Sequence, residues 1–164
     1  MGQVYYFRCK KCKHEYNILL GYGKLYSYSY KQTVENIKNG IYGDKWKNIF
    51  LSQDNLVVDI KQCLYTCQCG NWSVERSLTL YAPKNSDKPA PPYVMEDDLK
   101  SDYYCIKHYI HICKKCGSEM HKTDSTSEIM LSCPECENIN KPSILVYVDE
   151  YDFFNQKISR RIFL

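Results

Sequence analysis

Cysteines are the residues of this sequence best suited to chemistry, and there are ten of them among 164 residues. Eight form four close pairs, which are Cys9 and Cys12, Cys67 and Cys69, Cys113 and Cys116, and Cys133 and Cys136. A two-residue spacer, present in three of these pairs, folds as a tight turn that aims both sulfur atoms at one point. Two such turns complete a tetrahedron of thiolates around one Zn²⁺ ion. The sequence therefore predicts two closed zinc sites.

The spacing between pairs predicts how they combine. Cys116 and Cys133 are separated by 16 residues, which matches a common zinc-site pattern of two C-x-x-C pairs about 15 to 20 residues apart. We therefore expect one Zn²⁺ to be bound by Cys113, Cys116, Cys133 and Cys136. A second Zn²⁺ is then expected at Cys9, Cys12, Cys67 and Cys69.

The ligands of the second ion are less regular, because the pair Cys67 and Cys69 has a spacer of one residue. Side chains two positions apart on an extended chain face the same way, so both sulfur atoms can still reach one metal. Cys63 and His14 are alternative ligands for this site.

A further group of potential ligands comprises Cys105, His108 and His111. We interpret these three residues as parts of a strand, with His111 near the zinc site, and a third metal site is the alternative.

Catalytic use of the cysteines is less favoured by the sequence. Redox dithiols usually lie at the N-terminus of a helix, where the thiol pKa is lowered, and none of the pairs opens a clear helix. A catalytic zinc keeps an open coordination position, which a site of four cysteines lacks. The sequence also contains no H-E-x-x-H motif and no nucleoside-deaminase signature. We therefore expect no catalytic residues and no cofactor besides zinc, with a thiol redox protein or a metalloenzyme as the less favoured alternative.

Alternating apolar residues predict that most of the chain is β-structure. Strands are expected over residues 3–9, 14–20, 56–66, 73–81, 103–113, 128–133 and 143–149, with an edge strand in the tail 157–164. Two short helices are expected between the second and third strands. The first carries Tyr30 and Ile37 on one face and ends near Gly40, and the second begins with Asp44 as its N-cap.

A proline-rich segment, APKNSDKPAPP at residues 82–92, divides the chain. We expect residues 1–82 to form one domain with a helical insertion at about 22–55, residues 83–102 to form a linker, and residues 103–164 to form a second domain. Domains of this size have small cores and commonly need a metal or a disulfide for stability. The expected fold class is α+β, mainly β with a small helical insertion.

The cysteine pairs resemble those of zinc-ribbon, or rubredoxin-like, proteins. Cys113, Cys116, Cys133 and Cys136 match the paired turns of that family, and Cys9 with Cys12 matches the first half of another. The segments IKNGIYGDKW and LYTCQCGNW are also similar to an uncharacterised group of bacterial zinc-ribbon proteins. The resemblance implies two small antiparallel β domains and a role in binding, since zinc ribbons serve in transcription, translation and protein assembly.

The N-terminus has no apolar segment typical of a secretory signal, and no apolar run approaches the roughly 18 residues needed to span a bilayer. We therefore expect a cytoplasmic protein without a membrane partner. Reducing cytosol favours metal sites over disulfides for clustered cysteines.

The formal net charge of +3 falls to about −1 when eight thiolates bind two Zn²⁺ ions, so the chain lacks the excess positive charge of a strong nucleic-acid binder. The favoured function is a non-catalytic protein-interaction adaptor. Nucleic-acid binding is the alternative, through basic residues on the cysteine turns, which are Arg8, Lys10, Lys11, Lys13, Lys114 and Lys115.

The alternating tyrosines Tyr22, Tyr26, Tyr28 and Tyr30 predict either a contact face or, by preference, a hydrophobic cover over a thin sheet.

Overall fold

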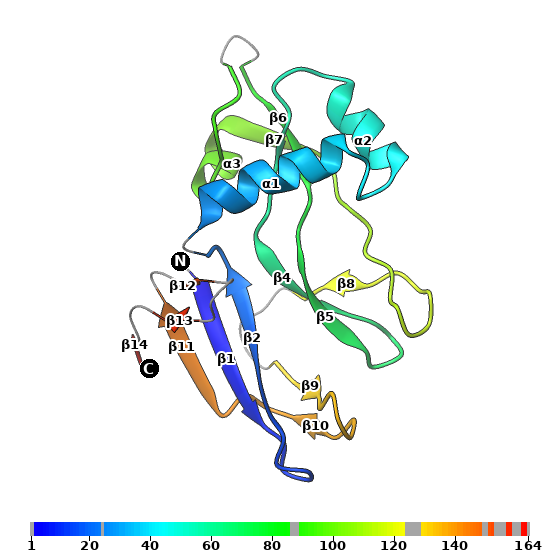
Figure 1. The fold of residues 1–164 in the computed structure, drawn as a ribbon, viewed down its shortest axis with the longest axis vertical. Helices are drawn as coiled ribbons and strands as arrows, with labels where there is room; N and C mark the ends of the chain where they lie inside the picture. The colour runs from blue at the N-terminus through cyan, green and yellow to red at the C-terminus, as the bar shows by residue number, and fades with distance from the viewer. Residues whose placement is uncertain are drawn as a thin grey trace. The chain divides into compact units, whose positions relative to one another are not determined.

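The computed structural model describes residues 2–23, 25–85, 89–123 and 129–148, together with the strand residues 151–152, 157–158 and 162–163. Within these residues the chain is mainly β-structure with three short helices, which confirms the expected fold class. The chain divides into two compact units, each built from segments that are not consecutive (Figure 1). Unit 1 comprises Met1–Lys24, Gln62–Glu75 and Ile110–Leu164, and unit 2 comprises Leu25–Lys61 and Arg76–Tyr109.

Unit 1 contains the largest sheet, in which β14, β11, β1, β2, β4 and β5 are neighbours in this order and β8 pairs with β4. Its strands are β1 (Gly2–Arg8), β2 (Glu15–Gly21), β4 (Gln62–Thr66), β5 (Trp72–Arg76), β8 (His121–Lys122), β11 (Ile144–Val148) and β14 (Ile162–Phe163). Two separate antiparallel pairs join β9 (Leu131–Ser132) to β10 (Ile139–Asn140) and β12 (Tyr151–Asp152) to β13 (Lys157–Ile158). The strand that follows the last cysteine pair, β11, therefore returns to the first strand of the chain, β1.

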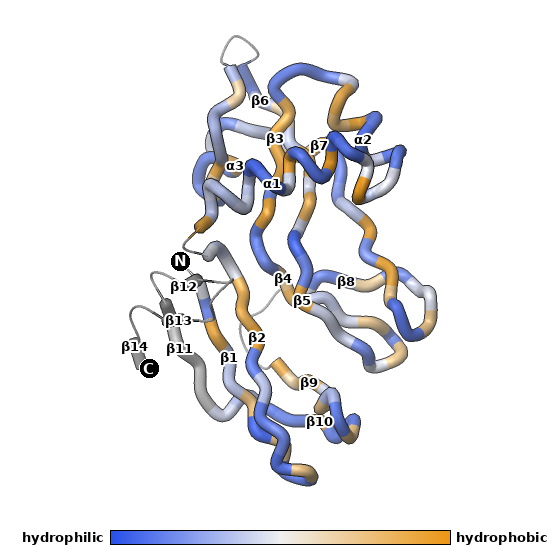
Figure 2. The backbone as a smooth tube through the Cα atoms, in the orientation of Figure 1, coloured by the Kyte–Doolittle hydropathy of each residue, from blue (hydrophilic) through white to orange (hydrophobic). Residues whose placement is uncertain are grey.

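The core of unit 1 is formed by one face of this sheet and the residues just before β9. Figure 2 shows hydrophobic stretches along β2 and at β9. The buried members of this core are Tyr5, Phe7, Ile18, Leu20, Leu64, Ile129 and Leu131, against which Tyr16, Trp72 and Val74 pack. Phe7 and Tyr16 are partners across β1 and β2, and their rings stack with centroids 4.8 Å apart. This core is small, as expected for a piece of chain that needs an additional staple.

Unit 2 consists of a three-stranded antiparallel sheet with three helices. The sheet has the order β3 (Val57–Val58), β6 (Leu80–Pro83), β7 (Tyr103–Lys107), and the helices are α1 (Tyr26–Lys38), α2 (Asp44–Leu51) and α3 (Glu96–Asp102). Helix α1 ends before Gly40, whose positive φ of 77° is the left-handed conformation that glycine adopts readily. Helix α2 begins one residue earlier than expected, because Gly43 is its N-cap and Asp44 lies in its first turn. No helix in the described part of the chain has the length and apolar character that crossing a bilayer requires.

Three of the four alternating tyrosines, which begin at Tyr22 and continue through the YSYSY segment, are buried. Tyr22, Tyr26 and Tyr30 are 7%, 8% and 5% exposed, whereas Tyr28 is 57% exposed. The Tyr26 hydroxyl donates to the Val94 carbonyl, which is itself in the buried part of unit 2. Three of the four tyrosines are therefore buried, which excludes a shared contact face for these three. Tyr26 and Tyr30 are buried in α1 of unit 2, which is not the unit that carries the cysteine turns.

The division into units differs from the consecutive domains expected from the sequence. The expected strands 56–66 and 73–81 are each interrupted, and in each case the two halves belong to different units. Asp59 accepts a hydrogen bond from the Lys61 backbone N–H at the first interruption, and Leu78 has a positive φ of 52° at the second. Residues 83–102, expected to be a linker, end β6 and include α3, and Val94 and Leu99 are buried in unit 2.

Candidate metal centres

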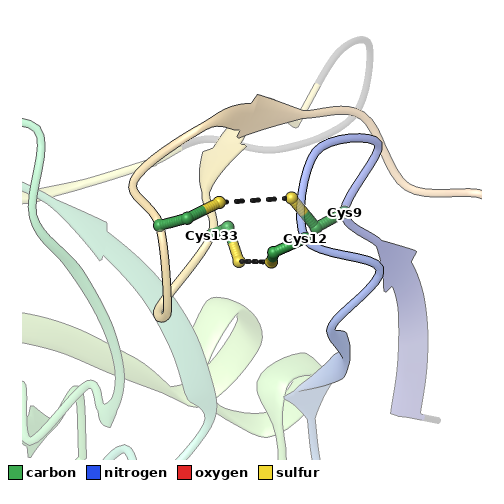
Figure 3. A group of neighbouring side chains, drawn as sticks. Cys9, Cys12 and Cys133 are labelled. Atoms are coloured by element: carbon green, nitrogen blue, oxygen red, sulfur yellow. Dashed lines mark hydrogen bonds between the residues drawn. The ribbon is translucent and has the colours of Figure 1, made fainter.

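The eight paired cysteines gather into two groups of four, both in unit 1. The first quartet is Cys9, Cys12, Cys133 and Cys136, and the second quartet is Cys67, Cys69, Cys113 and Cys116. Within each quartet all four sulfur atoms lie within 4.8 Å of one another. Figure 3 shows Cys9 and Cys12, from the turn between β1 and β2, facing Cys133 at the end of β9.

The expected grouping of the pairs is wrong, although the eight residues are the same. The sequence pattern grouped the first pair along the chain with the second, and the third pair with the fourth. In the structure the first pair (Cys9 and Cys12) groups with the fourth, and the second pair (Cys67 and Cys69) groups with the third, so that one grouping is nested inside the other. The reason lies in the strands that follow each turn. β11 follows the fourth pair and pairs with β1, which precedes the first pair, and β8 follows the third pair and pairs with β4, which precedes the second.

Each cysteine turn is closed by the same two backbone hydrogen bonds. In the turn that starts at Cys9, the Cys9 N–H donates to the His14 carbonyl over 2.8 Å and the Lys13 N–H donates to the Cys9 carbonyl over 3.0 Å. The turns that start at Cys113 and Cys133 repeat this pattern at the same offsets. The turn that starts at Cys67 keeps both bonds with each offset shortened by one residue. The one-residue spacer of Cys67 and Cys69 is therefore a shortened version of the same turn.

The residue after the second cysteine of every turn has a left-handed backbone conformation. These four residues are Lys13, Gly70, Gly117 and Glu137, with φ of 65°, 82°, 75° and 57°. Glycine adopts this conformation without a steric penalty, whereas other residues lose about 1–2 kcal/mol. The turns with Lys13 and Glu137 at this position therefore carry backbone strain, and the turns with Gly70 and Gly117 do not.

The turns place backbone donors against their own sulfur atoms. The pKa of Cys9 falls to about 6, chiefly because the Cys12 backbone N–H donates to its sulfur. Burial raises the pKa of Cys113, but donation from the backbone N–H groups of Cys116 and Lys115 and from the Asn71 amide lowers it to about 6. Donors of this kind stabilise thiolates, which are the form that binds metal.

The neighbouring sulfur atoms lower the pKa of Cys9 and Cys113 as well, but they raise the pKa of Cys12 and Cys67. The His14 backbone N–H lowers the pKa of Cys12, yet burial and the sulfur atoms of Cys136, Cys9 and Cys133 together raise it to about 12. The pKa of Cys67 likewise rises to about 12, because the sulfur of Cys116 and burial outweigh the donor of Cys69. Four thiolates so close together repel one another, and a divalent cation among them removes that penalty.

The sulfur separations fit a tetrahedral metal ion. In the first quartet Cys9 lies 3.5 Å from Cys136 and Cys12 lies 3.6 Å from Cys133. The corresponding distances in the second quartet are 3.4 Å from Cys67 to Cys116 and 3.7 Å from Cys69 to Cys113. A Zn–S bond of about 2.3 Å in a regular tetrahedron places sulfur atoms about 3.8 Å apart. All ten cysteines lie in the described part of the chain and are free thiols.

The two quartets are alike in orientation as well as size. The first cysteine of one turn contacts the second cysteine of the other in every case, as in an arrangement with approximate two-fold symmetry. In all four turns the first cysteine is buried and the second is exposed or half-buried. Each site therefore lies at the edge of unit 1, with one side toward solvent.

The remaining candidate ligands belong to neither quartet. Cys63 is buried beside Tyr65 and Met120 in a small apolar cluster, and His14 supplies backbone groups to its turn. Cys105 and His108 lie in unit 2, with sulfur and Nε2 3.6 Å apart, and His111 packs against the Tyr65 ring at 4.2 Å. The quartets are the only groups of three or more candidate ligands among the described residues.

Sequence reasoning did not identify the side chains that surround the ligands. The Asn71 amide donates to the Cys113 sulfur over 3.5 Å, and Lys115 forms a 2.7 Å ion pair with Glu137. A groove of about 610 Å³ lies between the quartets and is lined by Cys67, Cys69 and Cys133. None of these contacts has a local sequence signal, because each joins residues more than 20 positions apart.

Comparison of the chain with protein-family models, with curated proteins and with solved structures gave no match. The similarity to zinc ribbons therefore depends on the cysteine turns and on the geometry of the two quartets.

Paired substitutions distinguish the nested grouping from the consecutive one. Replacing Cys9 and Cys133 together by serine removes two ligands of one quartet, and we expect one metal ion per chain to remain. Replacing Cys113 and Cys133 together damages both quartets, and we expect no ion to be retained. Native mass spectrometry of the purified variants counts the ions, and the opposite pair of results would restore the consecutive grouping.

The strained turns predict which substitutions change stability. Gly117→Ala introduces a Cβ that meets no atom within 4 Å, so it is expected to lower the free energy of unfolding by about 1 kcal/mol through backbone strain alone. Lys13→Gly removes such strain and is expected to raise it by up to about 1 kcal/mol, whereas the control Lys13→Ala retains the strain. Denaturant unfolding of the metal-loaded proteins measures both effects. A loss of stability in Lys13→Gly would contradict this account.

Proposed function

We propose that this chain is a zinc-binding protein in which two Zn²⁺ ions staple the β-structure of unit 1. The proposed ligands are Cys9, Cys12, Cys133 and Cys136 for one ion and Cys67, Cys69, Cys113 and Cys116 for the other. The observation that carries this proposal is the pair of four-sulfur groups. In each group all sulfur atoms lie within 4.8 Å of one another, and the two sulfur–sulfur contacts across the turns are 3.4 to 3.7 Å long, close to the tetrahedral value of about 3.8 Å. Tetrahedral sites with four sulfur ligands are typical of structural zinc.

The role of such zinc is structural and not catalytic. A hydrolytic zinc has three protein ligands and an open position for water, whereas each quartet supplies four sulfur atoms to one ion. The ions would therefore hold turns and strands in place and would not activate a substrate. A cytoplasmic location is part of this proposal, because reducing conditions keep the eight thiols available for metal.

We further propose that the stapled scaffold is a protein-interaction adaptor. Met130 and Ile139 line the groove between the quartets, and they are 51% and 62% exposed. Methionine is enriched at protein–protein interfaces, and two exposed apolar side chains that line one groove favour contact with a partner protein. The ions would act on this surface indirectly, because Cys133 and Cys136 hold the turn that separates the two residues.

Nucleic-acid binding is the second candidate, and the exposed lysines of the first turn favour it. Lys10 and Lys11 are both exposed on this turn. Two other basic residues of the turns pair with carboxylates, since Arg8 lies 3.6 Å from Glu15 and Lys115 lies 2.7 Å from Glu137. Together with the net charge of about −1 expected for the zinc-loaded chain, these ion pairs favour the adaptor.

Removing the metal is expected to unfold unit 1 before unit 2. Each unit contains one of the two tryptophans, Trp72 in unit 1 and Trp46 in unit 2, so the variants Trp46→Phe and Trp72→Phe report on one unit each. We expect a chelator to shift the emission of Trp72 to longer wavelength at a lower concentration than that of Trp46, because zinc binding supplies folding free energy only where its ligands lie. The zinc scaffold would be refuted if the purified protein contained no bound metal and the chelator did not change its Trp72 emission.

Binding measurements separate the two candidate functions. If the adaptor is correct, zinc-loaded protein binds single-stranded DNA or RNA weakly, and charge reversal by Lys10→Glu with Lys11→Glu leaves that binding unchanged. Binding that falls steeply with salt and is lost in this double variant would establish the nucleic-acid alternative. The matched control is Lys38→Glu, which reverses a lysine on α1 far from the cysteine turns in sequence.

A further inference from the structure

The two quartets are joined by hydrogen bonds between residues that adjoin their ligands. Ser132, which precedes the ligand Cys133, donates from its hydroxyl to the Gly70 carbonyl over 3.1 Å. Gly70 itself follows the ligand Cys69. The Trp72 indole Nε1 donates to the Ser132 carbonyl over 2.8 Å. We call these two hydrogen bonds the Ser132 bridge.

Two further contacts connect the same turns. The rings of Tyr16 and Trp72 stack with centroids 6.0 Å apart, and the Tyr16 hydroxyl donates to the Leu131 carbonyl over 3.5 Å. Lys115, between the ligands Cys113 and Cys116, pairs with Glu137, which follows Cys136. Both members of this ion pair are more than half exposed, so it contributes little. The Ser132 bridge and the aromatic stack are therefore the main connections.

We propose, on the basis of the zinc scaffold proposed above, that the two metal sites bind their ions cooperatively through the Ser132 bridge. Binding of an ion to the first quartet fixes Cys133 and hence the backbone and hydroxyl of Ser132. Ser132 then holds Gly70 and Trp72, which restricts the turn carrying Cys67 and Cys69 before the second ion arrives. The conformational entropy of that turn is thus already lost when the second ion arrives. The second ion therefore binds more tightly, because its binding no longer includes that entropic cost.

The coupling acts equally in both directions, because linkage between two binding equilibria is reciprocal. Coupling factors between binding sites in proteins are typically about 5- to 150-fold. For a bridge of two hydrogen bonds we expect one bound ion to raise the zinc affinity of the other quartet about tenfold. The consequence is that the chain passes from metal-free to doubly loaded over a narrower range of free zinc than independent sites would give, with less of the singly loaded form.

The population of singly loaded wild-type chains tests this proposal. Metal-free protein is titrated with Zn²⁺ in a zinc buffer, and native mass spectrometry gives the populations at an average of one ion per chain. Independent sites of equal affinity leave about half of the chains singly loaded, and independent sites of unequal affinity leave more, whereas tenfold coupling between equal sites leaves about a quarter. Variants that keep one quartet, Cys9→Ser with Cys133→Ser and Cys67→Ser with Cys113→Ser, give the affinity of each site alone. A wild-type singly loaded population equal to or larger than the one calculated from these two affinities for independent sites would overturn the proposal.

Variants assign the coupling to the bridge. The double variant Ser132→Ala with Trp72→Phe removes both hydrogen-bond donors, and we expect two ions still to bind at excess zinc while the singly loaded population rises to the value calculated for independent sites. Ser143→Ala is the matched control, because the Ser143 hydroxyl also donates to a backbone carbonyl, that of Tyr6 over 3.0 Å, without joining the two quartets. An unchanged distribution in the double variant would remove the bridge as the cause of coupling.

The outcomes separate this proposal from the zinc scaffold on which it depends. A wild-type chain that takes up two ions independently retains the scaffold and loses the coupling. A chain that takes up none at any zinc concentration loses both.

Discussion

The repulsion among closely spaced thiolates is the physical constraint that unit 1 has to satisfy. Each quartet holds four sulfur atoms within 4.8 Å, and the pKa values of Cys12 and Cys67 rise to about 12 because their neighbours oppose ionisation. The backbone donors of the turns favour thiolates at Cys9 and Cys113 in the same two groups. A cation bound at the centre of each quartet would reconcile these opposing tendencies, because it would let all four sulfur atoms be charged.

The nested grouping makes each quartet, with the ion proposed for it, a link between distant parts of the chain. The first quartet joins the hairpin of β1 and β2 to the hairpin of β9 and β10, more than 100 residues later. The second quartet joins the turn between β4 and β5 to the turn before β8. Cross-links that close long loops remove the most freedom from the unfolded chain, so this topology suits a unit with a small core.

Unit 2 differs in how it is stabilised, since it contains neither quartet. Its centre is apolar: Val57, Val58, Leu80 and Val94 are fully buried. Tyr26 and Tyr30 extend this packing, and burial raises the pKa of Tyr30 to about 12. The tyrosine-rich segment therefore serves the interior, which leaves the groove of unit 1 as the better candidate for contact with a partner.

Local sequence was sufficient for every feature that depends on neighbouring residues. The four cysteine turns follow from the spacing of their cysteines, and even the short spacer of Cys67 and Cys69 closes with the expected pair of hydrogen bonds. The β-rich character and the two helices of residues 25–61 follow from apolar periodicity, with boundaries within one or two residues for β1 and β2. The eight proposed ligands could also be chosen from the sequence alone, because turn geometry is decided within six residues.

Only the tertiary structure decided which turns face each other. Any two of the four turns could complete a tetrahedron, so spacing alone does not distinguish the three possible groupings, and the 16-residue interval between Cys116 and Cys133 favoured the wrong one. The grouping is determined by strand pairing, β11 with β1 and β8 with β4, which joins residues far apart in the chain. The same long-range pairing interrupts the apparent strands 56–66 and 73–81, because the chain must pass between two units that a local pattern cannot distinguish.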